Sequence, residues 1–387
     1  METKRWILWA VFSFSLSLPS NVNSQPVIFG KMDADVQLVS TSRAEQGAAG
    51  SRMRLATNAS RIGARGSMAL GSGLEAVWQV ATRVNLNGAE TGGGGGLFTL
   101  MGNTRVGIKS NFGTVFLGIW DTPFRQVFDK IDLFDQSHIG SPIGMLGSIG
   151  NCIGGTGMLP ATAQGFHPTV ANVSVASTGF HRRQKSSVHY WSPLFQQIQL
   201  KVAYSMDDPA NKTSIADPAL FSSSISYDSE PVYLAAAYEL HQDLKAVKGA
   251  NVEGVDMGAR LVCAYFRGAG KLGVIYELLS YHAPATGTTQ RAAISVSGSC
   301  RFGNVNLGAV ATHADALSGT NDTGADQYSL RAGYFLSDVV ELFAQYTVIR
   351  NRTNGTYNFG DGLSLATAPG ARISGFGMGI AYALQPG

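Results

Sequence analysis

Apolar and polar residues alternate with a period of two along most of this chain. Between Ile28 and Leu38 the apolar side chains share one parity, and Lys31, Asp33 and Asp35 occupy the other. Successive side chains of a β-strand point to opposite faces, so this pattern predicts a strand with one apolar and one polar face. The pattern recurs in about sixteen segments. They are residues 28–38, 60–70, 74–87, 101–110, 113–121, 181–191, 197–205, 221–228, 232–241, 255–266, 271–282, 291–301, 304–313, 327–336, 340–350 and 372–384.

The connections between these segments are alternately short and long. Short connections such as 71–73 and 302–304 contain glycine or asparagine, which tight turns favour. Bacterial membrane β-barrels have an even number of antiparallel strands, with short turns at one end and long loops at the other. We therefore predict an all-β fold, a transmembrane antiparallel β-barrel of about sixteen strands. The long connections are residues 40–59, 88–100, 122–180, 206–220, 242–254, 283–290, 314–326 and 351–371.

Composition narrows the fold class without identifying a chemistry. Charged residues make up 14% of the chain, against about 25% in typical soluble domains, and there are 47 glycines. Beyond residue 24 no stretch of about 20 apolar residues could span a membrane as a helix. Since only helices and closed barrels satisfy every backbone polar group in lipid, a barrel is favoured, and a secreted all-β protein is the alternative. The formal net charge of +3 predicts no nucleic-acid partner.

The first 24 residues have the layout of a secretory signal peptide. Two basic residues precede an apolar stretch at 6–18, and small residues follow it. Such a segment directs export and is then cleaved, and this one is too short for a membrane-spanning helix. We therefore expect residues 1–24 to be removed on export through the Sec pathway. Residues 25–387 are expected to form one barrel in the outer membrane of a Gram-negative bacterium.

The residues that usually carry chemistry are few and scattered. Cys152, Cys263 and Cys300 lie far apart, which favours isolated thiols, with a Cys263–Cys300 disulfide as the alternative. The seven histidines show no metal-ligand spacing, and no nucleophile motif precedes a predicted helix. The glycine run at 92–96 is not followed by a helix that would present a phosphate site, so it indicates a flexible loop. We expect no cofactor, no metal ion and no catalytic residue.

The polar parity of the predicted strands carries most of their charge. In a barrel whose apolar parity faces lipid, the polar parity lines the lumen. Most charges on the second to sixth predicted strands are basic, and several cations on one wall raise the local concentration of anions. We therefore predict a water-filled pore with a preference for anions. The predicted constriction wall consists of Arg61, Arg65, Arg83, Arg105, Lys109 and Arg183.

The connection at 122–180 is much longer than the others, and connections of this length usually have a function. A barrel of about sixteen strands encloses a lumen wide enough for water, so an inserted loop is needed to narrow it. We predict that residues 122–180 fold into the lumen as a constriction loop. Acidic residues at its start are opposite in sign to the basic wall and would create a transverse field that orients dipolar solutes. They are Asp121, Asp129, Asp132 and Asp135.

Three parts of the sequence carry a family resemblance. They are Ser60-Arg-Ile-Gly-Ala-Arg-Gly66 with the Leu70-Gly-Ser-Gly-Leu-Glu run that follows, residues 105–124, and residues 180–193. These parts resemble strands of the general porins of β-proteobacteria, of the Neisseria and Burkholderia type. The resemblance implies a homotrimer of sixteen-stranded barrels, each with its own pore and with the third loop folded inward. It also implies a constriction role for Arg61, Arg83 and Arg105.

Two features depart from that family. Its members usually end on an aromatic residue that the barrel-assembly machinery reads, whereas this chain ends Gln385-Pro-Gly387, and its third loop is longer. The expected function is passive diffusion of ions and small hydrophilic solutes by a protein in contact with outer-membrane lipid. Periplasmic chaperones and the barrel-assembly machinery are its expected partners in assembly.

Two alternatives stay open at this point. One is a substrate-specific channel or surface adhesin built on the same barrel. The other is an outer-membrane barrel enzyme, such as a protease or phospholipase, which needs paired acidic, histidine or serine groups. The sequence disfavours the enzyme, because His138, His167 and His181 have no obvious acidic or nucleophilic partner.

Overall fold

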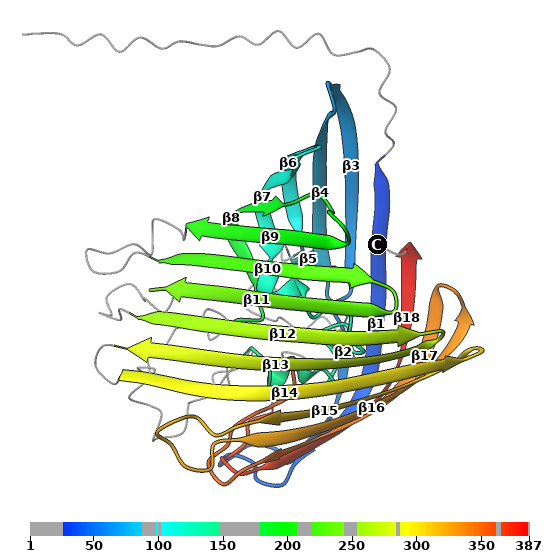
Figure 1. Ribbon diagram of the computed structural model, residues 1–387. Helices are drawn as coiled ribbons and strands as arrows, with labels where there is room; N and C mark the ends of the chain where they lie inside the picture. The colour runs from blue at the N-terminus through cyan, green and yellow to red at the C-terminus, as the bar shows by residue number, and fades with distance from the viewer. Residues whose placement is uncertain are drawn as a thin grey trace, which may run out of the picture.

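The computed structural model describes residues 26–86, 98–99, 102–147, 179–206, 218–243, 254–283, 287–360 and 365–385. Their strands form an antiparallel sheet that closes on itself (Figure 1). Closure occurs because β1 (Val27–Thr41) pairs with β18 (Arg372–Gln385), with Met32 opposite Tyr382. A closed sheet leaves no unpaired edge, which is the condition for a sheet that spans lipid.

The remaining strands follow one another around the barrel in chain order. They are β2 (Ser51–Thr57), β3 (Arg61–Gly71), β4 (Leu74–Val84), β5 (Phe98–Thr99), β6 (Thr104–Ser110), β7 (Gly113–Asp121), β8 (Arg183–Trp191), β9 (Ile198–Met206), β10 (Ala219–Ser229), β11 (Val232–Gln242), β12 (Val255–Arg267), β13 (Gly270–Ala283), β14 (Gly287–Phe302), β15 (Val305–Ala314), β16 (Ala325–Ser337) and β17 (Val340–Asn351).

Two pairs of strands, β2 with β3 and β5 with β6, each occupy a single strand position around the barrel. The eighteen described strands therefore fill sixteen positions, which confirms the predicted fold class. β2 and β3 both pair with β1, and β5 and β6 both pair with β4. β2 and β3 are separated where Ala59 adopts a φ of 49°. On either side of Ala59, the side chains of Asn58 and Ser60 donate hydrogen bonds to Asp33 of β1.

The predicted strands differ from the observed ones by at most four residues at either end. Two strands were missed: the two-residue β5 lies inside the connection predicted at 88–100, and β2 lies inside the one predicted at 40–59. Its apolar positions, Met53 and Leu55, face outward at 76% and 46% exposure and alternate with arginines. The repeat covers only seven residues before the break at Ala59, which is too short to stand out in the sequence.

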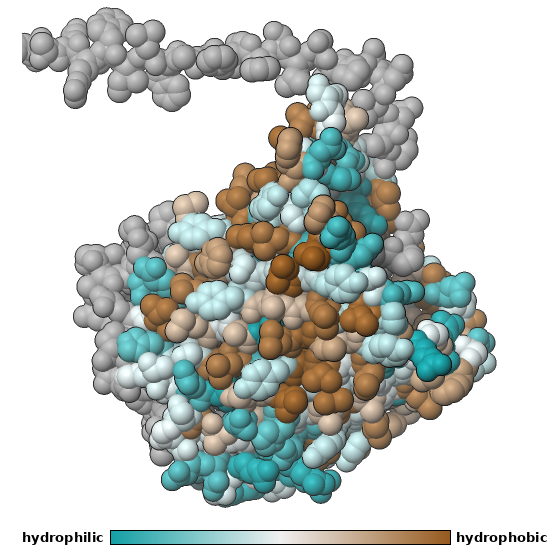
Figure 2. All heavy atoms as spheres, in the orientation of Figure 1, coloured by the Kyte–Doolittle hydropathy of each residue, from teal (hydrophilic) through white to brown (hydrophobic). Residues whose placement is uncertain are grey.

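The two faces of the barrel wall differ as the alternation predicts. Outward side chains such as Ile28, Leu117 and Leu330 are apolar and more than half exposed. Inward positions on the same strands carry polar groups, and Asp33 and Asp35 on β1 are fully buried. Figure 2 shows apolar side chains gathered on the outer face over β10–β14. An apolar exterior of this kind suits contact with lipid tails.

The described residues of the connection after β7 pack against inward-facing residues of the barrel strands. The connection begins with α1 (Pro123–Gln126), where the Thr122 hydroxyl accepts a hydrogen bond from the Arg125 N–H at 3.4 Å. A 3-10 helix, η1 (Pro142–Gly144), follows. Apolar side chains of this connection join inward-facing wall residues in one buried cluster. They are Phe124, Val127, Phe128, Ile131, Ile139, Ile143, Met145 and Leu146.

Within the described ranges, no helix is long and apolar enough to cross a membrane. Cys263 on β12 and Cys300 on β14 are free thiols on strands that are separated by β13. The alternative of a disulfide between them is therefore wrong. Cys152 and the predicted signal peptide at 1–24 lie outside the described residues.

Candidate functional site in the barrel lumen

Four arginines gather on one side of the lumen, and we call Arg61, Arg83, Arg125 and Arg183 the basic cluster. Arg61 on β3 lies opposite Arg83 on β4 in the strand register. Arg83 is within electrostatic range of the other three guanidinium groups. Three members come from barrel strands, whereas Arg125 belongs to α1 in the connection after β7. The side chain of Arg61 is 42% exposed, so part of this positive charge faces open space.

Two of the four predicted acids are ion-paired with basic side chains. Asp121, at the end of β7, lies 3.3 Å from Arg125 and 3.0 Å from Arg183. Asp135 accepts hydrogen bonds from Lys31 at 2.9 Å and from Arg61 at 3.3 Å. Asp135 therefore ties the connection after β7 to β1 and β3.

The other two predicted acids, Asp129 and Asp132, have no ion-pair partner among the described residues. Asp129 is exposed to the lumen but surrounded by the barrel, and this enclosure together with the Asp121 carboxylate raises its pKa to about 7. Enclosure also raises the pKa of Asp132 to about 6, although the Phe134 N–H donates to its carboxylate at 2.9 Å. Both acids can therefore change charge near neutral pH.

Arg105, on the inward face of β6, lies among aromatic rings. Its guanidinium carbon is 4.8 Å from the ring centre of Phe116, 4.5 Å from that of Trp120 and 5.0 Å from that of Trp191. Its Nε and Nη1 atoms are buried and have no hydrogen-bond partner among the described residues. The cation is thus stabilised by ring faces, in contrast to the exposed Arg61.

The two remaining predicted wall residues, Arg65 and Lys109, lie closer to the short turns than Arg61 and Arg83 do. Arg65 stacks over the Phe29 ring at 5.3 Å. Lys109 pairs with Glu75 at 3.2 Å, and its side chain is 60% exposed. Of the six predicted wall residues, the structure brings Arg61, Arg83 and Arg183 together and gives the other three different neighbours.

A buried ion triad, formed by Arg260, Glu277 and Arg291 on β12, β13 and β14, anchors the connection after β7. Glu277 accepts from Arg260 Nε at 3.1 Å and from Arg291 Nη2 at 3.1 Å, and all three side chains are fully buried. Arg260 also donates to the Phe124 carbonyl at 3.1 Å, and Arg291 donates to the Met145 carbonyl at 2.7 Å. The triad therefore holds the connection against the wall at two places, Phe124 and Met145.

Sequence reasoning did not select this triad. The available signal was three inward positions of alternating charge on adjacent strands, with Arg260 opposite Glu277 in the register. The two backbone carbonyls that complete it are more than 130 residues away in sequence, so no local pattern indicates them.

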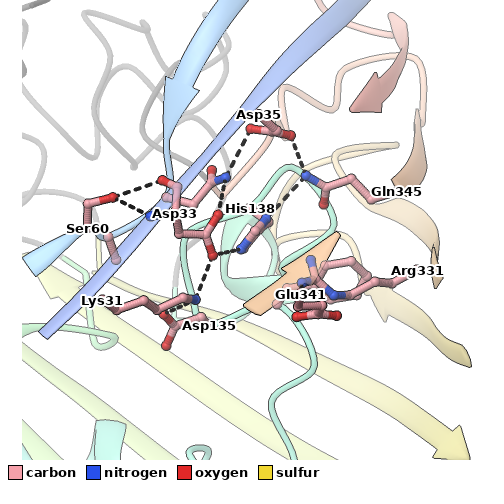
Figure 3. A network of polar contacts seen from close by, with 12 residues as sticks. Lys31, Asp33, Asp35, Ser60, Asp135, His138, Arg331, Glu341 and Gln345 are labelled. Atoms are coloured by element: carbon pink, nitrogen blue, oxygen red, sulfur yellow. Dashed lines mark hydrogen bonds and ion pairs between the residues drawn. The ribbon is translucent and has the colours of Figure 1, made fainter. Parts of the chain in front are cut away.

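Figure 3 shows a second anchor, where the connection meets β1. His138 Nε2 lies 3.1 Å from Asp33 Oδ2, and Gln345 lies 3.2 Å from the other ring nitrogen of His138. Lys31 bridges Asp33 and Asp135 beside them. His138 thus has an acidic partner, contrary to the sequence interpretation. Because both side chains are at most 1% exposed, the pair cannot reach a substrate and acts as a structural contact.

A polar cavity of about 370 Å³ lies between this connection and the wall. No group of three or more histidine, cysteine or acidic side chains in the described ranges could hold a metal ion. The charged side chains that line the cavity carry both signs. Its charged lining consists of Lys31, Arg61, Asp129, Asp132, Asp135, Lys271, Arg331 and Glu341.

Comparisons with solved structures agree with this fold. An anion-selective porin from Comamonas acidovorans is 22% identical, with a TM-score of 0.73, over 93% of this chain and 100% of that chain. OmpT of Vibrio cholerae in its trimer form is 14% identical, with a TM-score of 0.62, over 93% of this chain and 99% of that one. OmpF of Salmonella typhi in complex with daunomycin is 12% identical, with a TM-score of 0.62, over 93% and 98%.

No curated protein matches the sequence significantly. A family model described as Gram-negative porin, however, matches residues 9–354, which is most of the chain. This match and the closed sixteen-position barrel point to a channel rather than an enzyme. The chain therefore belongs to the Gram-negative porin family and is an outer-membrane β-barrel channel.

Proposed function

We propose that this porin is a passive diffusion pore for ions and small hydrophilic solutes that prefers anions. The basic cluster is the observation that carries the preference, because four guanidinium groups lie together beside two paired acids, Asp121 and Asp135. Like charges that are held close together in a water-filled lumen attract counter-ions and lower the barrier to anion entry.

The described part of the connection after β7 supports a role as constriction loop. At one end, the Phe124 N–H donates to the Ser222 hydroxyl of β10 at 3.1 Å. Eleven residues later, Asp135 reaches Lys31 on β1 and Arg61 on β3. We propose that residues 122–180 narrow the lumen in this way and that their acids oppose the basic cluster. Residues 148–178 of this loop lie outside the described residues.

Other parts of the proposal rest on the sequence. They are a cleaved Sec signal at 1–24, a barrel domain at 25–387, and assembly by periplasmic chaperones and the barrel-assembly machinery. A homotrimer is supported by the resemblance to β-proteobacterial general porins of the Neisseria and Burkholderia type. The trimer form in which OmpT of Vibrio cholerae was solved gives it further support.

Reconstitution of the purified protein tests the channel directly. We expect stepwise conductance increases in planar bilayers and swelling of liposomes in small sugars, with swelling rates that fall as the sugar becomes larger. Absence of both conductance and swelling from a folded, heat-modifiable barrel would overturn the pore. Saturable block of conductance by one solute would instead favour the substrate-specific channel.

A further inference from the structure

Part of the connection between β17 and β18 also packs inside the barrel. Tyr357 and Phe359 are each only 1% exposed, although loops at the end of a barrel normally face water. Asn351 Nδ2 donates to the Tyr357 carbonyl at 2.9 Å, and the Tyr357 N–H donates to Asn351 Oδ1 at 2.7 Å. We call residues 356–360 the inner segment. These two bonds fix its start against the end of β17.

The inner segment is in direct contact with the returning limb of the constriction loop, residues 139–146. A Cβ added to Gly144 would lie 2.3 Å from the Asn358 carbonyl oxygen. One added to Gly360 would lie 2.6 Å from Ile143 Cγ1. These separations are shorter than van der Waals contact, so the two backbones touch with no room for a side chain between them.

The barrel wall holds the opposite side of the same limb. Gln327 on β16 donates to the Gly140 carbonyl at 3.1 Å. On β18, a Cβ added to Gly375 would lie 2.9 Å from Ile139 Cδ1 and 3.1 Å from Phe359 Cζ. The ring of Phe359 and the side chain of Ile139 therefore share one site on the wall. The returning limb is packed between the strands and the inner segment.

We propose that the inner segment positions the constriction loop, so that Tyr357 and Phe359 are positioning residues for the width and steadiness of the pore. This inference rests on the proposed role of residues 122–180 in narrowing the lumen. The returning limb begins four residues after Asp135, which pairs with Arg61. A shift of the limb therefore moves the acid that faces the basic cluster. Packed contacts switch between discrete arrangements, so loss of this contact gives a second position of the loop.

Single-channel recordings of Phe359→Ala and Phe359→Leu test the proposal. Removal of a buried phenyl ring shifts a packing equilibrium by about 100-fold or more. We expect transitions between two current levels in Phe359→Ala, and fewer in Phe359→Leu. The matched control is Phe376→Ala, which removes a 44% exposed ring from the outer face of β18 and should leave the current steady. A steady Phe359→Ala current at wild-type conductance would overturn the proposal.

A covalent tether keeps the test valid if Phe359→Ala fails to fold. The variant Ile143→Cys/Gly360→Cys, made in a chain whose three native cysteines are replaced by serine, joins the limb to the inner segment. The position of Ile143 Cγ1, 2.6 Å from a Cβ at residue 360, is close to that of a bonded sulfur. When reduced, the added Cβ should displace the inner segment and give two-level currents; when oxidised, the current should become steady. Equal currents in both states, with the disulfide verified by thiol labelling, would contradict the proposal.

Two further measurements separate failure of this inference from failure of the proposed function. A folded wild type that does not conduct rejects the pore itself. Labelling of Asp135→Cys with a bulky thiol reagent should reduce conductance if the loop narrows the lumen, and no reduction rejects the constriction role. If conductance and labelling behave as proposed but Phe359→Ala stays steady, only the positioning role fails.

Discussion

On the β3–β8 side of the lumen, Arg61 is 42% exposed and lies beside other arginines. On the β12–β14 side, Arg260 and Arg291 are fully buried on either side of Glu277 and donate to loop carbonyls. Both groups occupy inward positions of neighbouring strands. Because a buried charge is costly unless it is paired, the paired arginines of the second side hold the loop, whereas the exposed part of the first side can act on solutes.

Glu277→Gln should have the largest effect, because it leaves two arginines buried without their counter-charge. Removal of one partner from a buried ion pair costs about 3–5 kcal/mol. We expect a corresponding loss in the free energy of unfolding, measured by urea titration in lipid vesicles and followed by gel mobility. The control Lys109→Gln breaks the exposed pair with Glu75 and should cost less than about 1 kcal/mol. Equal losses of unfolding free energy in the two variants would contradict the view that only the β12–β14 side depends on buried ion pairs.

Arg61→Gln/Arg83→Gln should change selectivity more than stability. A unit charge acts on an ion 10 Å away in water with about 0.4 kcal/mol, which is about a twofold change in local ion concentration per charge. We expect the ratio of anion to cation permeability to fall severalfold in the double variant, measured as a reversal potential.

Arg105→Gln should behave in the opposite way. Its guanidinium is enclosed by three aromatic rings, so its replacement should reduce stability, by about 2 kcal/mol, and leave selectivity nearly unchanged. A selectivity shift as large as that of the double variant would show that Arg105 belongs with the basic cluster.

Acidification should increase the anion preference by a smaller amount. Enclosure raises the pKa of Asp129 to about 7 and that of Asp132 to about 6, so both acids lose their negative charge as the pH falls from 8 to 5. Burial and the nearby Arg125 hold the pKa of His181 well below its usual range, so His181 stays neutral in this window. Asp129→Asn should remove the part of the change near pH 7. Selectivity that is constant or falls on acidification would contradict this assignment.

The sequence predicts the barrel because most strands have nine or more residues, and lipid-facing and lumen-facing residues alternate along them. β2 was missed because Ala59 interrupts the pattern after seven residues. For the site, parity placed Arg61 and Arg105 on the same face but could not distinguish them, since the rings around Arg105 are an arrangement in space. The contacts of Arg260 and His138 join a loop to strands far away in the sequence, and those of Phe359 help to join two loops, so no local periodicity encodes them.

The zero-current potential across a planar bilayer in a potassium chloride gradient tests the central claim most directly, because the two ions have similar mobility in water. For the wild type at neutral pH, we predict a potential of the sign set by chloride. For Arg61→Gln/Arg83→Gln, we predict a clear shift toward zero. A wild-type potential of zero, or of the sign set by potassium, would contradict the proposal that the basic cluster makes this porin prefer anions.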